Sequence, residues 1–440
     1  MPHYDFILAG SGLAGFTLAL ELARRPFFRD KKILLLDRDE KVKNDRTWCF
    51  WATDAEKALL PPVIFKTWDH CRFYGPGTDL DLHIAPYRYH LVRGADFYAW
   101  AKAELARAPR IERLTATITA LEPDRGVVTT DRGEFSGDWI FNSALTEAPL
   151  LPAASSLYPL PSLTVNQGND ANYANYSNYG NYGNYGNYSN YANYGNYSNY
   201  GNYSNYSNYT FLLQHFKGWL IETPAPAFDP GQVTFMDYRL EQKRETRFVY
   251  VLPFSETRAL VEFTVFSPTL CPSEEYDAEL QRYIRERLGI REFRIEEEEF
   301  GVIPMTDYPF RPMAGGRVVR IGTAGGFVKA SSGYAFKRTQ RKLRAFADHW
   351  EKYGAPDPRV LRSPRRFRFY DSVMLRVLRD GAVSGKDFFT GLFRKLPAPL
   401  VFRFLDEDSS LAEDLHLLSA PPTWPFFKTA VQGFTRGIKI

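Results

Sequence analysis

Three glycines near the start of the chain have the spacing of a nucleotide-binding loop. Gly10, Gly12 and Gly15 form a G-x-G-x-x-G pattern between an apolar run and a helix-like run. Such glycines permit a tight turn, backbone approach to a pyrophosphate and close helix packing, while helix amides face the phosphates. Asp37 ends the next apolar run, where a carboxylate reaches a ribose hydroxyl. The pattern predicts a dinucleotide site, with a purely structural glycine turn as the alternative.

A second glycine cluster lies far along the chain. Gly322, Gly325 and Gly326 follow the strand-like run at residues 318–321. A domain that binds only NAD does not usually need a second glycine loop, whereas in an FAD-binding domain such a loop can meet the pyrophosphate or ribityl chain. We therefore expect FAD, the alternative being a turn before a helix that binds no ligand.

Glu262 is the acidic residue best placed for proton chemistry. It belongs to an expected strand over residues 259–266, and its side chain shares a face with Leu260, Thr264 and Phe266. Apolar surroundings desolvate a carboxyl group and raise its pKa, so that it can hold and donate a proton near neutral pH. If the strand lies at a sheet edge, Glu262 is instead an exposed surface residue.

Several elements must position these groups. The first glycine loop needs a strand–helix–strand unit, and the Thr-, Ile- and Val-rich segment 111–144 predicts an antiparallel meander beside it. Runs at 248–254 and 259–266 predict a hairpin, and 274–288 predicts a helix. The expected fold class is α/β: a Rossmann-type FAD-binding domain, a second antiparallel-sheet substrate domain and a helical C-terminal region.

A three-residue repeat interrupts the chain. From residue 172 to residue 210, Asn-Tyr followed by Ala, Ser or Gly recurs. Because such a tract cannot bury enough surface to fold, we expect a disordered insertion, with a solenoid as the alternative. The expected segments are the FAD-binding βαβ unit (1–60), a substrate-domain segment (61–110), the FAD-domain meander and strand (111–165), the insertion (166–210), the substrate domain (211–300), a second FAD-contacting segment (301–340) and the helical C-terminal region (341–440).

Composition argues against several functions. The 55 basic and 51 acidic residues leave a net charge of +4, too small to indicate nucleic-acid binding. The 3 cysteines lie far apart, which argues against a metal site and a disulfide framework and favours a reducing cytoplasm. No export signal is recognised, and no apolar run approaches the roughly 18 residues of a spanning helix. Any membrane contact is therefore expected to be peripheral.

Further motifs occur in a fixed order along the chain. They are NDRTWCFW (44–51), MDY (236–238), VLPFS (251–255), VEFT (261–264), GVIPMT (301–306) and GTAGG (322–326). Together they resemble the lycopene β-cyclase family, most closely its bacterial members, over nearly the whole chain. The chain departs from the family pattern at the Asn-Tyr tract and at residues 329–333, where a proline is common. Both departures bear on loop geometry rather than on chemistry.

The resemblance implies a glutathione-reductase-type FAD fold and an intramolecular lyase that closes the linear ends of lycopene into β-rings, giving γ-carotene and then β-carotene. It also implies reduced FAD without net redox turnover, NADPH as the reductant and Glu262 as the proton donor. Arg46 is expected near flavin or phosphate, or else as a solvated surface residue. Aromatic faces can stabilise the carbocation, although each candidate is also an ordinary core residue. The candidates are Trp48, Phe50, Trp51 and Tyr334.

The resemblance and the C-terminal composition together bear on location. Arginines and aromatic residues mix at 359–370, a composition that suits anionic lipid headgroups, although charge runs are usually solvated. With an apolar substrate implied, we expect a cytoplasmic protein bound peripherally to the inner membrane. Two other functions remain open: a flavin-dependent NAD(P)H oxidoreductase, such as a monooxygenase or geranylgeranyl reductase, and a flavin-binding carotenoid carrier.

Overall fold

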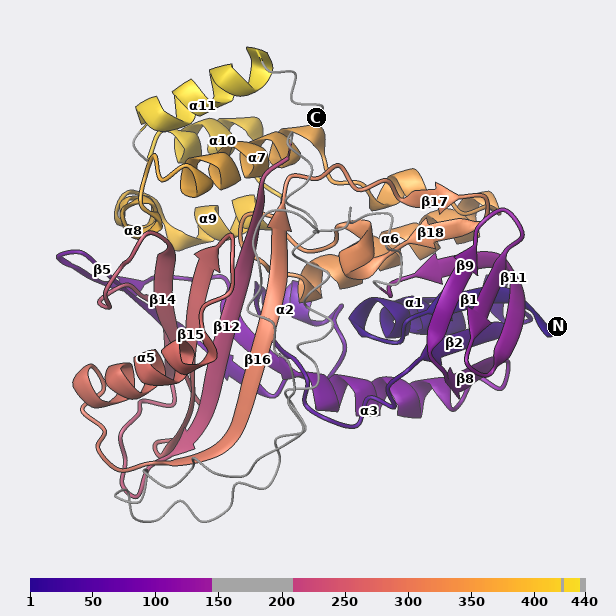
Figure 1. Cartoon of the computed structure of the whole chain (residues 1–440), viewed down its shortest axis with the longest axis horizontal. Coiled ribbons are helices and arrows are strands. Elements are labelled where there is room, and N and C mark those ends of the chain that lie inside the picture. Colours follow the sequence, from indigo (N-terminus) through magenta and orange to yellow (C-terminus); the bar gives the residue numbers. More distant parts are fainter. Residues whose placement is uncertain (145–208, 421–422, 436–440) are drawn as a thin grey trace, which may run out of the picture. The chain divides into compact units, whose positions relative to one another are not determined.

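The computed structural model describes residues 1–144, 209–420 and 423–435 (Figure 1). These residues belong to one unit formed by Met1–Glu147 and Asn208–Ile440. The prediction of a disordered insertion at 166–210 falls outside the described residues except at Tyr209 and Thr210.

The first sheet is built around the N-terminal strand. In the described residues its main path runs through β17 (Met313–Gly315), β18 (Val318–Arg320), β11 (Gly133–Asn142), β1 (His3–Ala9), β2 (Ile33–Asp37) and β8 (Ile111–Thr115). β1 pairs in parallel with both β2 and β11, and α1 (Leu13–Ala23) connects β1 to β2. β9 (Ile118–Glu122), β10 (Val127–Thr130) and β11 form an antiparallel meander, whereas β8, which begins the segment 111–144 predicted to form it, pairs in parallel with β2. Because β1 and β2 are buried on both faces, they are nearly continuous apolar runs.

The second sheet carries the predicted hairpin near its centre. Its strands, in spatial order within the described part of the chain, are β16 (Arg294–Thr306), β12 (Phe211–Glu222), β15 (Arg258–Ser267), β14 (Thr246–Pro253), β13 (Gln232–Asp237), β5 (His70–Gly75) and β6 (Thr78–Leu82). β14 and β15 form the hairpin. The helix α5 (Ser273–Glu286) covers one face, where Val261 and Phe263 meet Tyr276 and Leu280 in a buried cluster.

A small sheet lies against both halves of the fold. It consists of β3 (Thr47–Ala52), β7 (Arg88–Arg93) and β4 (Lys66–Trp68). Alternate residues of β3 join different cores, since Phe50 packs with the cluster around α1 and Trp51 packs with the cluster on the other face of the second sheet. β3 therefore has one face toward the cofactor half and one toward the second sheet.

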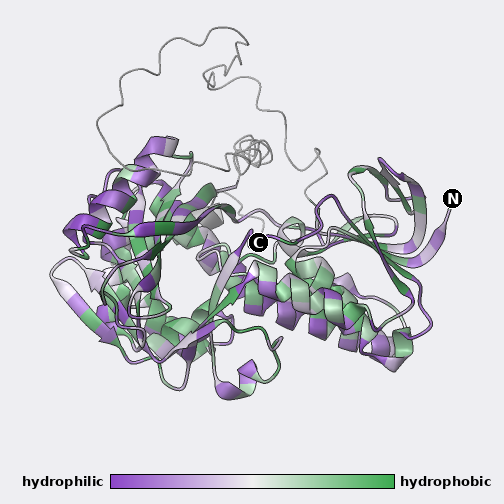
Figure 2. Cartoon of the chain, turned by 90° about the horizontal axis from the view of Figure 1, so that it is seen from below, coloured by the Kyte–Doolittle hydropathy of each residue, from purple (hydrophilic) through white to green (hydrophobic). Residues whose placement is uncertain are grey.

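Helices complete both halves. α6 (Phe336–Tyr353) packs along α1, and α3 (Gly94–Leu105) lies on the same core. The short helix α2 (Asp54–Lys57) follows β3. The C-terminal region is helical, as expected, with α7 (Arg365–Arg379), α8 (Gly385–Lys395), α9 (Ala398–Leu405), α10 (Leu411–Leu418) and α11 (Thr423–Thr435). Many helical ribbons alternate green and purple bands, the pattern of amphipathic helices (Figure 2). Among the described helices, none combines the length and apolar character needed to cross a membrane.

Candidate active site

The first glycine loop joins β1 to α1 in the conformation that its sequence predicts. Gly10 has a φ of +103°, which side chains rarely tolerate. A Cβ on Gly15 would lie 1.9 Å from the carbonyl oxygen of Gly10, so only glycine permits this close approach of helix and turn. These two glycines are needed by the fold itself.

Gly12 is different, because neither its backbone nor its protein neighbours require a glycine. It has a φ of −80° and a ψ of −161°, and an added Cβ would meet no atom within 4 Å. Open space beside the backbone at the start of a helix is what a pyrophosphate needs. The residues present therefore fit a bound dinucleotide.

Asp37 ends β2 beside this loop. Its Oδ2 accepts a hydrogen bond from the amide of Ser11 at 2.7 Å, and its Oδ1 accepts one from the amide of Asp39 at 3.0 Å. A carboxylate has about four acceptor positions, so it can still accept a hydroxyl. The contact of Asp37 with a ribose hydroxyl stays a prediction.

The second glycine cluster lies against the first. Gly322–Gly325 form a short 3-10 turn after β18, and β18 pairs in parallel with β11. A Cβ on Gly322 would lie 2.9 Å from the Cβ of Ala14 at the start of α1, and Gly326 adopts a φ of +72°. The fold thus brings together two loops that are far apart in sequence, which is the arrangement that the FAD prediction requires.

Glu262 lies on a central strand. β15 pairs with β12 on one side and β14 on the other, so the alternative of an exposed edge-strand glutamate is wrong. The residue as a whole is half-buried, and its Oε1 accepts a hydrogen bond from the Thr264 hydroxyl at 2.8 Å. On the same face lie Leu260 and Phe266, as the strand period predicts.

A second carboxyl group faces Glu262, and sequence reasoning missed it. Gly218 of β12 pairs with Glu262 on one side and with Glu299 of β16 on the other. The two glutamates therefore flank a residue without a side chain. Glu299 fills that space, because a Cβ on Gly218 would lie 3.0 Å from its Cγ. Its Oε2 accepts a hydrogen bond from the Thr47 hydroxyl of β3 at 2.6 Å.

The environment of the pair favours a protonated carboxyl. Burial raises the pKa of Glu262 well above its ordinary value, and the negative charge of Glu299 raises it further. Burial also raises the pKa of Glu299, but the hydrogen bond from Thr47 and the charge of Arg46 oppose that rise. Glu262 is therefore the member of the pair that retains a proton to higher pH.

The four predicted aromatic residues fall into two groups. Trp48 and Phe50 face the cofactor half, where their rings lie 5.6 Å and 5.1 Å from that of Phe336. Trp51 and Tyr334 lie on the other side, with ring centroids 4.5 Å apart. Strand alternation explains the division, since Thr47, Cys49 and Trp51 share the face opposite to Trp48 and Phe50. Only Trp51 and Tyr334 belong to the cluster that includes residues beside Glu262.

Two tyrosines that the sequence did not single out join this cluster. Tyr250 of β14 pairs with Glu262 across the hairpin, and Tyr89 of β7 lies with its hydroxyl 3.2 Å from that of Tyr334. Burial raises the pKa of Tyr89, Tyr250 and Tyr334, so these phenols stay neutral and can donate hydrogen bonds. Glu262 thus has neutral aromatic neighbours and one acidic neighbour.

Arg46 precedes Thr47, the residue of β3 that hydrogen-bonds Glu299. It is half-buried, and its charge opposes the rise that burial causes in the pKa of Tyr98 and of Glu299. Two buried histidines have structural partners: His215 hydrogen-bonds the hydroxyls of Ser267 and Tyr276, and His90 that of Thr67. Burial lowers the pKa of each histidine to about 4, so both are neutral at ordinary pH.

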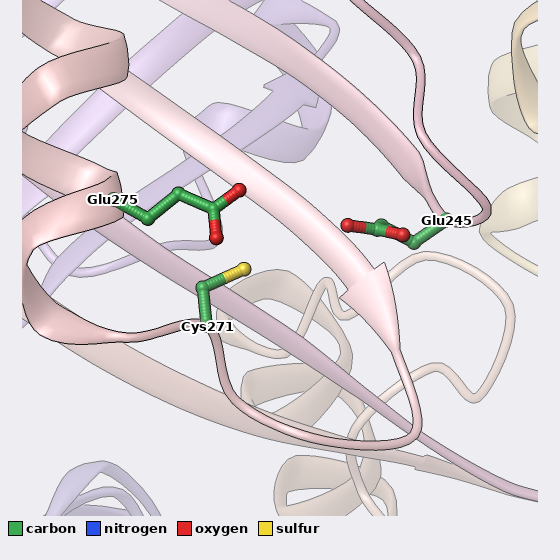
Figure 3. A group of neighbouring side chains, drawn as sticks. All are labelled: Glu245, Cys271 and Glu275. Carbon is green, nitrogen blue, oxygen red and sulfur yellow. The ribbon is translucent and has the colours of Figure 1, made fainter.

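Two further groups that contain acidic side chains converge outside this site in the described residues, and the first includes a cysteine. Glu245, Cys271 and Glu275 point toward one another from two loops and α5 (Figure 3). The guanidinium of Arg247 donates to Glu245 at 2.9 Å and to Glu275 at 2.6 Å. Burial would raise the pKa of Glu275, but hydrogen bonds from Lys243 and Arg247 outweigh it and lower that pKa. An arginine thus occupies the place that a cation would take.

The basic segment near residue 360 is only partly a surface feature. Arg359, Arg362 and Arg365 are exposed, whereas Arg366 forms an ion pair with Asp414. Phe367 is fully buried, so it belongs to the core and cannot meet lipid. Exposed apolar side chains lie on α10 and α11 instead. They are Leu411, Leu415, Trp424, Phe427 and Val431.

Solved structures with a similar fold are flavoenzymes. A geranylgeranyl bacteriochlorophyll reductase-like protein from Thermoplasma acidophilum matches 97% of this chain and 98% of its own, with a TM-score of 0.59 and 12% identity. A flavoprotein/dehydrogenase from Cytophaga hutchinsonii matches 98% of this chain and 99% of its own, with a TM-score of 0.56 and 13% identity. At such low identity the likeness shows the fold alone, an FAD-enzyme fold.

Sequence relatives are lycopene cyclases. The chloroplastic lycopene beta cyclase of Arabidopsis thaliana is 34% identical over 178 residues, which are 37% of this chain and 33% of that protein. The lycopene beta-cyclase of Pantoea ananas is 34% identical over 70 residues, 15% of this chain and 18% of that protein. The matched segments thus span about a third or less of these relatives. The model of the family described as lycopene cyclase protein matches residues 5–157 and 197–431, and the chain therefore belongs to the lycopene cyclase family.

Proposed function

We propose that this protein is a lycopene β-cyclase that closes the linear ends of lycopene by acid chemistry. The observation that carries the proposal is Glu262, a carboxyl group on a central strand whose pKa is raised by burial and by a second carboxylate. General acids work best when their pKa lies near the working pH. The apolar and aromatic surroundings suit a polyene substrate.

In the proposed step, a proton leaves the Glu262 carboxyl and forms a C–H bond at the terminal alkene. The neighbouring double bond attacks the resulting carbocation and forms the ring C–C bond. A base then takes a proton from the ring carbon, which gives a β-ring, and Glu262 regains a proton from solvent before the next ring forms. Substrate and product are therefore isomers. The rings of Trp51 and Tyr334 and the carboxylate of Glu299 are the groups of this chain that can stabilise positive charge there.

The cofactor in this proposal is FAD in its reduced form, with NADPH as the reductant. Gly10, Gly12 and Gly15, with Asp37, would hold the pyrophosphate and ribose, and Gly322, Gly325 and Gly326 would face the flavin end. Bound in this form, the flavin would supply negative charge beside a carbocation.

The protein is proposed to work on the cytoplasmic side of the inner membrane, where its apolar substrate dissolves. The exposed side chains of α10 and α11, with the nearby exposed arginines, have the composition of a surface that enters an anionic bilayer interface. Trp and Phe on such a helix provide apolar burial, and arginine provides attraction to headgroups.

Replacing Trp424 and Phe427 together by serine is expected to weaken binding to vesicles of anionic phospholipid by about tenfold or more, because burying one large apolar side chain contributes about 1.5–3 kcal/mol. Cosedimentation measures the effect. Serine at Phe27 and Tyr353, which are exposed on the cofactor half, is the matched control and should leave binding unchanged. Equal binding of all three proteins would place the membrane contact elsewhere.

Pigment analysis tests the proposed function. A host that accumulates lycopene should form γ-carotene and β-carotene when it expresses this chain. A flavin-dependent reductase would instead add hydrogen and yield pigments heavier than lycopene, whereas ring closure leaves the mass unchanged, and a carotenoid carrier would leave lycopene unaltered. Either of these two outcomes would exclude the cyclase.

A further inference from the structure

Glu299 stands opposite Glu262 because of strand register. The two glutamates belong to β15 and β16, which are separated by β12, so their backbones lie about 10 Å apart. Both pair with Gly218, whose missing side chain leaves the space between them to the carboxyl arms. Any larger residue at position 218 would stand where Glu299 reaches toward Glu262.

Within the part of the chain that the structure describes, only one of the two carboxyl oxygens of Glu299 has a hydrogen-bond donor outside the pair. Its Oε2 accepts a hydrogen bond from Thr47. Its Oε1 is buried and, among the described residues, accepts none from a hydroxyl, an amide or a cationic group. A buried acceptor without a donor is costly. A protonated carboxyl is a donor, and Glu262 is the carboxyl that lies on this side of Glu299.

We propose that Glu262 and Glu299 form one unit that shares a single proton, in which Glu299 is the ionised positioning residue and keeps the proton on Glu262. This inference rests on the proposed function, since it assigns a role to Glu299 in the same reaction. Thr47 donates to the ionised member, and Thr264 donates to Oε1 of the protonated member. Two carboxyls that hydrogen-bond each other in a buried site cannot both ionise easily, so the pair retains one proton over a wide pH range.

Other titratable or charged groups face the pair from the surrounding elements. They are Arg46 before β3, Cys49 of β3, Tyr89 of β7, Tyr250 of β14, Glu297 of β16 and Tyr334 before α6. Burial raises the pKa of Cys49 and of the three tyrosines, so these four are neutral at ordinary pH. Arg46 favours the ionised form of Glu299, while Glu297 opposes it.

The test is the pH profile of ring formation by the holoenzyme. Activity requires protonated Glu262 and is lost as pH rises through the pKa of that carboxyl. Glu299→Gln removes the neighbouring charge, so the alkaline limb should move to lower pH by about one unit or more. Glu298→Gln is the matched control, because Glu298 immediately precedes Glu299 in β16, is exposed on the opposite face and is paired with Lys217. Its profile should remain that of the parent.

A second variant changes the geometry and keeps both carboxyls. Gly218→Ala places a Cβ 3.0 Å from the Cγ of Glu299, so Glu299 must move and the alkaline limb should shift in the same direction. A structural role alone would lower activity without moving the limb. An unmoved limb in both Glu299→Gln and Gly218→Ala would overturn the shared proton.

Infrared spectroscopy separates this inference from the proposed function. The C=O band of a protonated carboxyl should disappear in Glu262→Gln and titrate at lower pH in Glu299→Gln than in the parent. If the parent forms no rings, the cyclase proposal fails, while this titration still decides whether the carboxyls share a proton. A band that titrates identically with and without Glu299 would refute the sharing.

Discussion

Glu262→Gln is expected to abolish ring formation while FAD remains bound, so that a lycopene-accumulating host keeps its lycopene. Glutamine has nearly the volume of a protonated glutamate and can still hydrogen-bond to Thr264, but it has no proton to deliver. General acid catalysis contributes roughly 10²–10⁴ in rate. Pigment analysis at matched protein levels measures the loss.

The matched control is Glu256→Gln, which makes the same change at an exposed position in the link of the same hairpin and should leave pigments unaltered. The fold of Glu262→Gln can be checked by its stability. Because the pKa of Glu262 is raised, the folded parent holds a proton that the unfolded chain has released at any pH between the ordinary glutamate pKa and the raised one. Over this pH range the contribution of Glu262 to the free energy of unfolding falls as pH rises. The variant lacks this slope. Substantial β-carotene from Glu262→Gln would assign the proton to another group.

Gly12→Val is expected to remove bound flavin and leave the fold intact. The backbone at Gly12 suits any residue, and an added Cβ meets no protein atom, so valine costs the apoprotein little. Its side chain would stand where a pyrophosphate must approach the backbone. We expect flavin affinity to fall by at least roughly tenfold, measured as the flavin-to-protein absorbance ratio after purification.

Two comparisons make this result specific. Gly391→Val introduces the same side chain into open space on α8 and should retain flavin. Gly15→Val, whose Cβ would collide with the Gly10 carbonyl, should lower thermal stability as well as flavin content. Full flavin occupancy in Gly12→Val would mean that the open space beside this residue is not a phosphate site.

Local patterns were sufficient to predict the parts of the site that depend on neighbouring residues in sequence. The glycine spacing predicted the loop after β1, and strand alternation placed Glu262 among apolar side chains. The same alternation puts Trp48 and Phe50 on one face of β3 and Trp51 on the other, so the sequence pattern was sufficient to divide these candidates. The proximity of the two glycine loops was expected from the chemistry of FAD and agrees with the contact between Gly322 and Ala14.

Glu299 could not be identified in this way. It ends a run of four glutamates, which in sequence looks like a solvated strand face, and the two before it, Glu297 and Glu298, are exposed. Its importance depends on the register of three strands and on a glycine in the middle one. Likewise, the central position of β15 depends on β12, which follows the Asn-Tyr tract. Long-range pairing, rather than local propensity, decides both points.

In the proposed reaction, this chain closes β-rings by proton transfer without net oxidation or reduction. The most direct measurement uses purified holoenzyme whose FAD has been reduced once under anaerobic conditions, supplied with lycopene in vesicles and no further reductant. Many rings should form for each flavin, and the flavin spectrum should still be that of the reduced form at the end. Oxidation of one flavin for each product molecule, or reduced flavin without any rings, would contradict it.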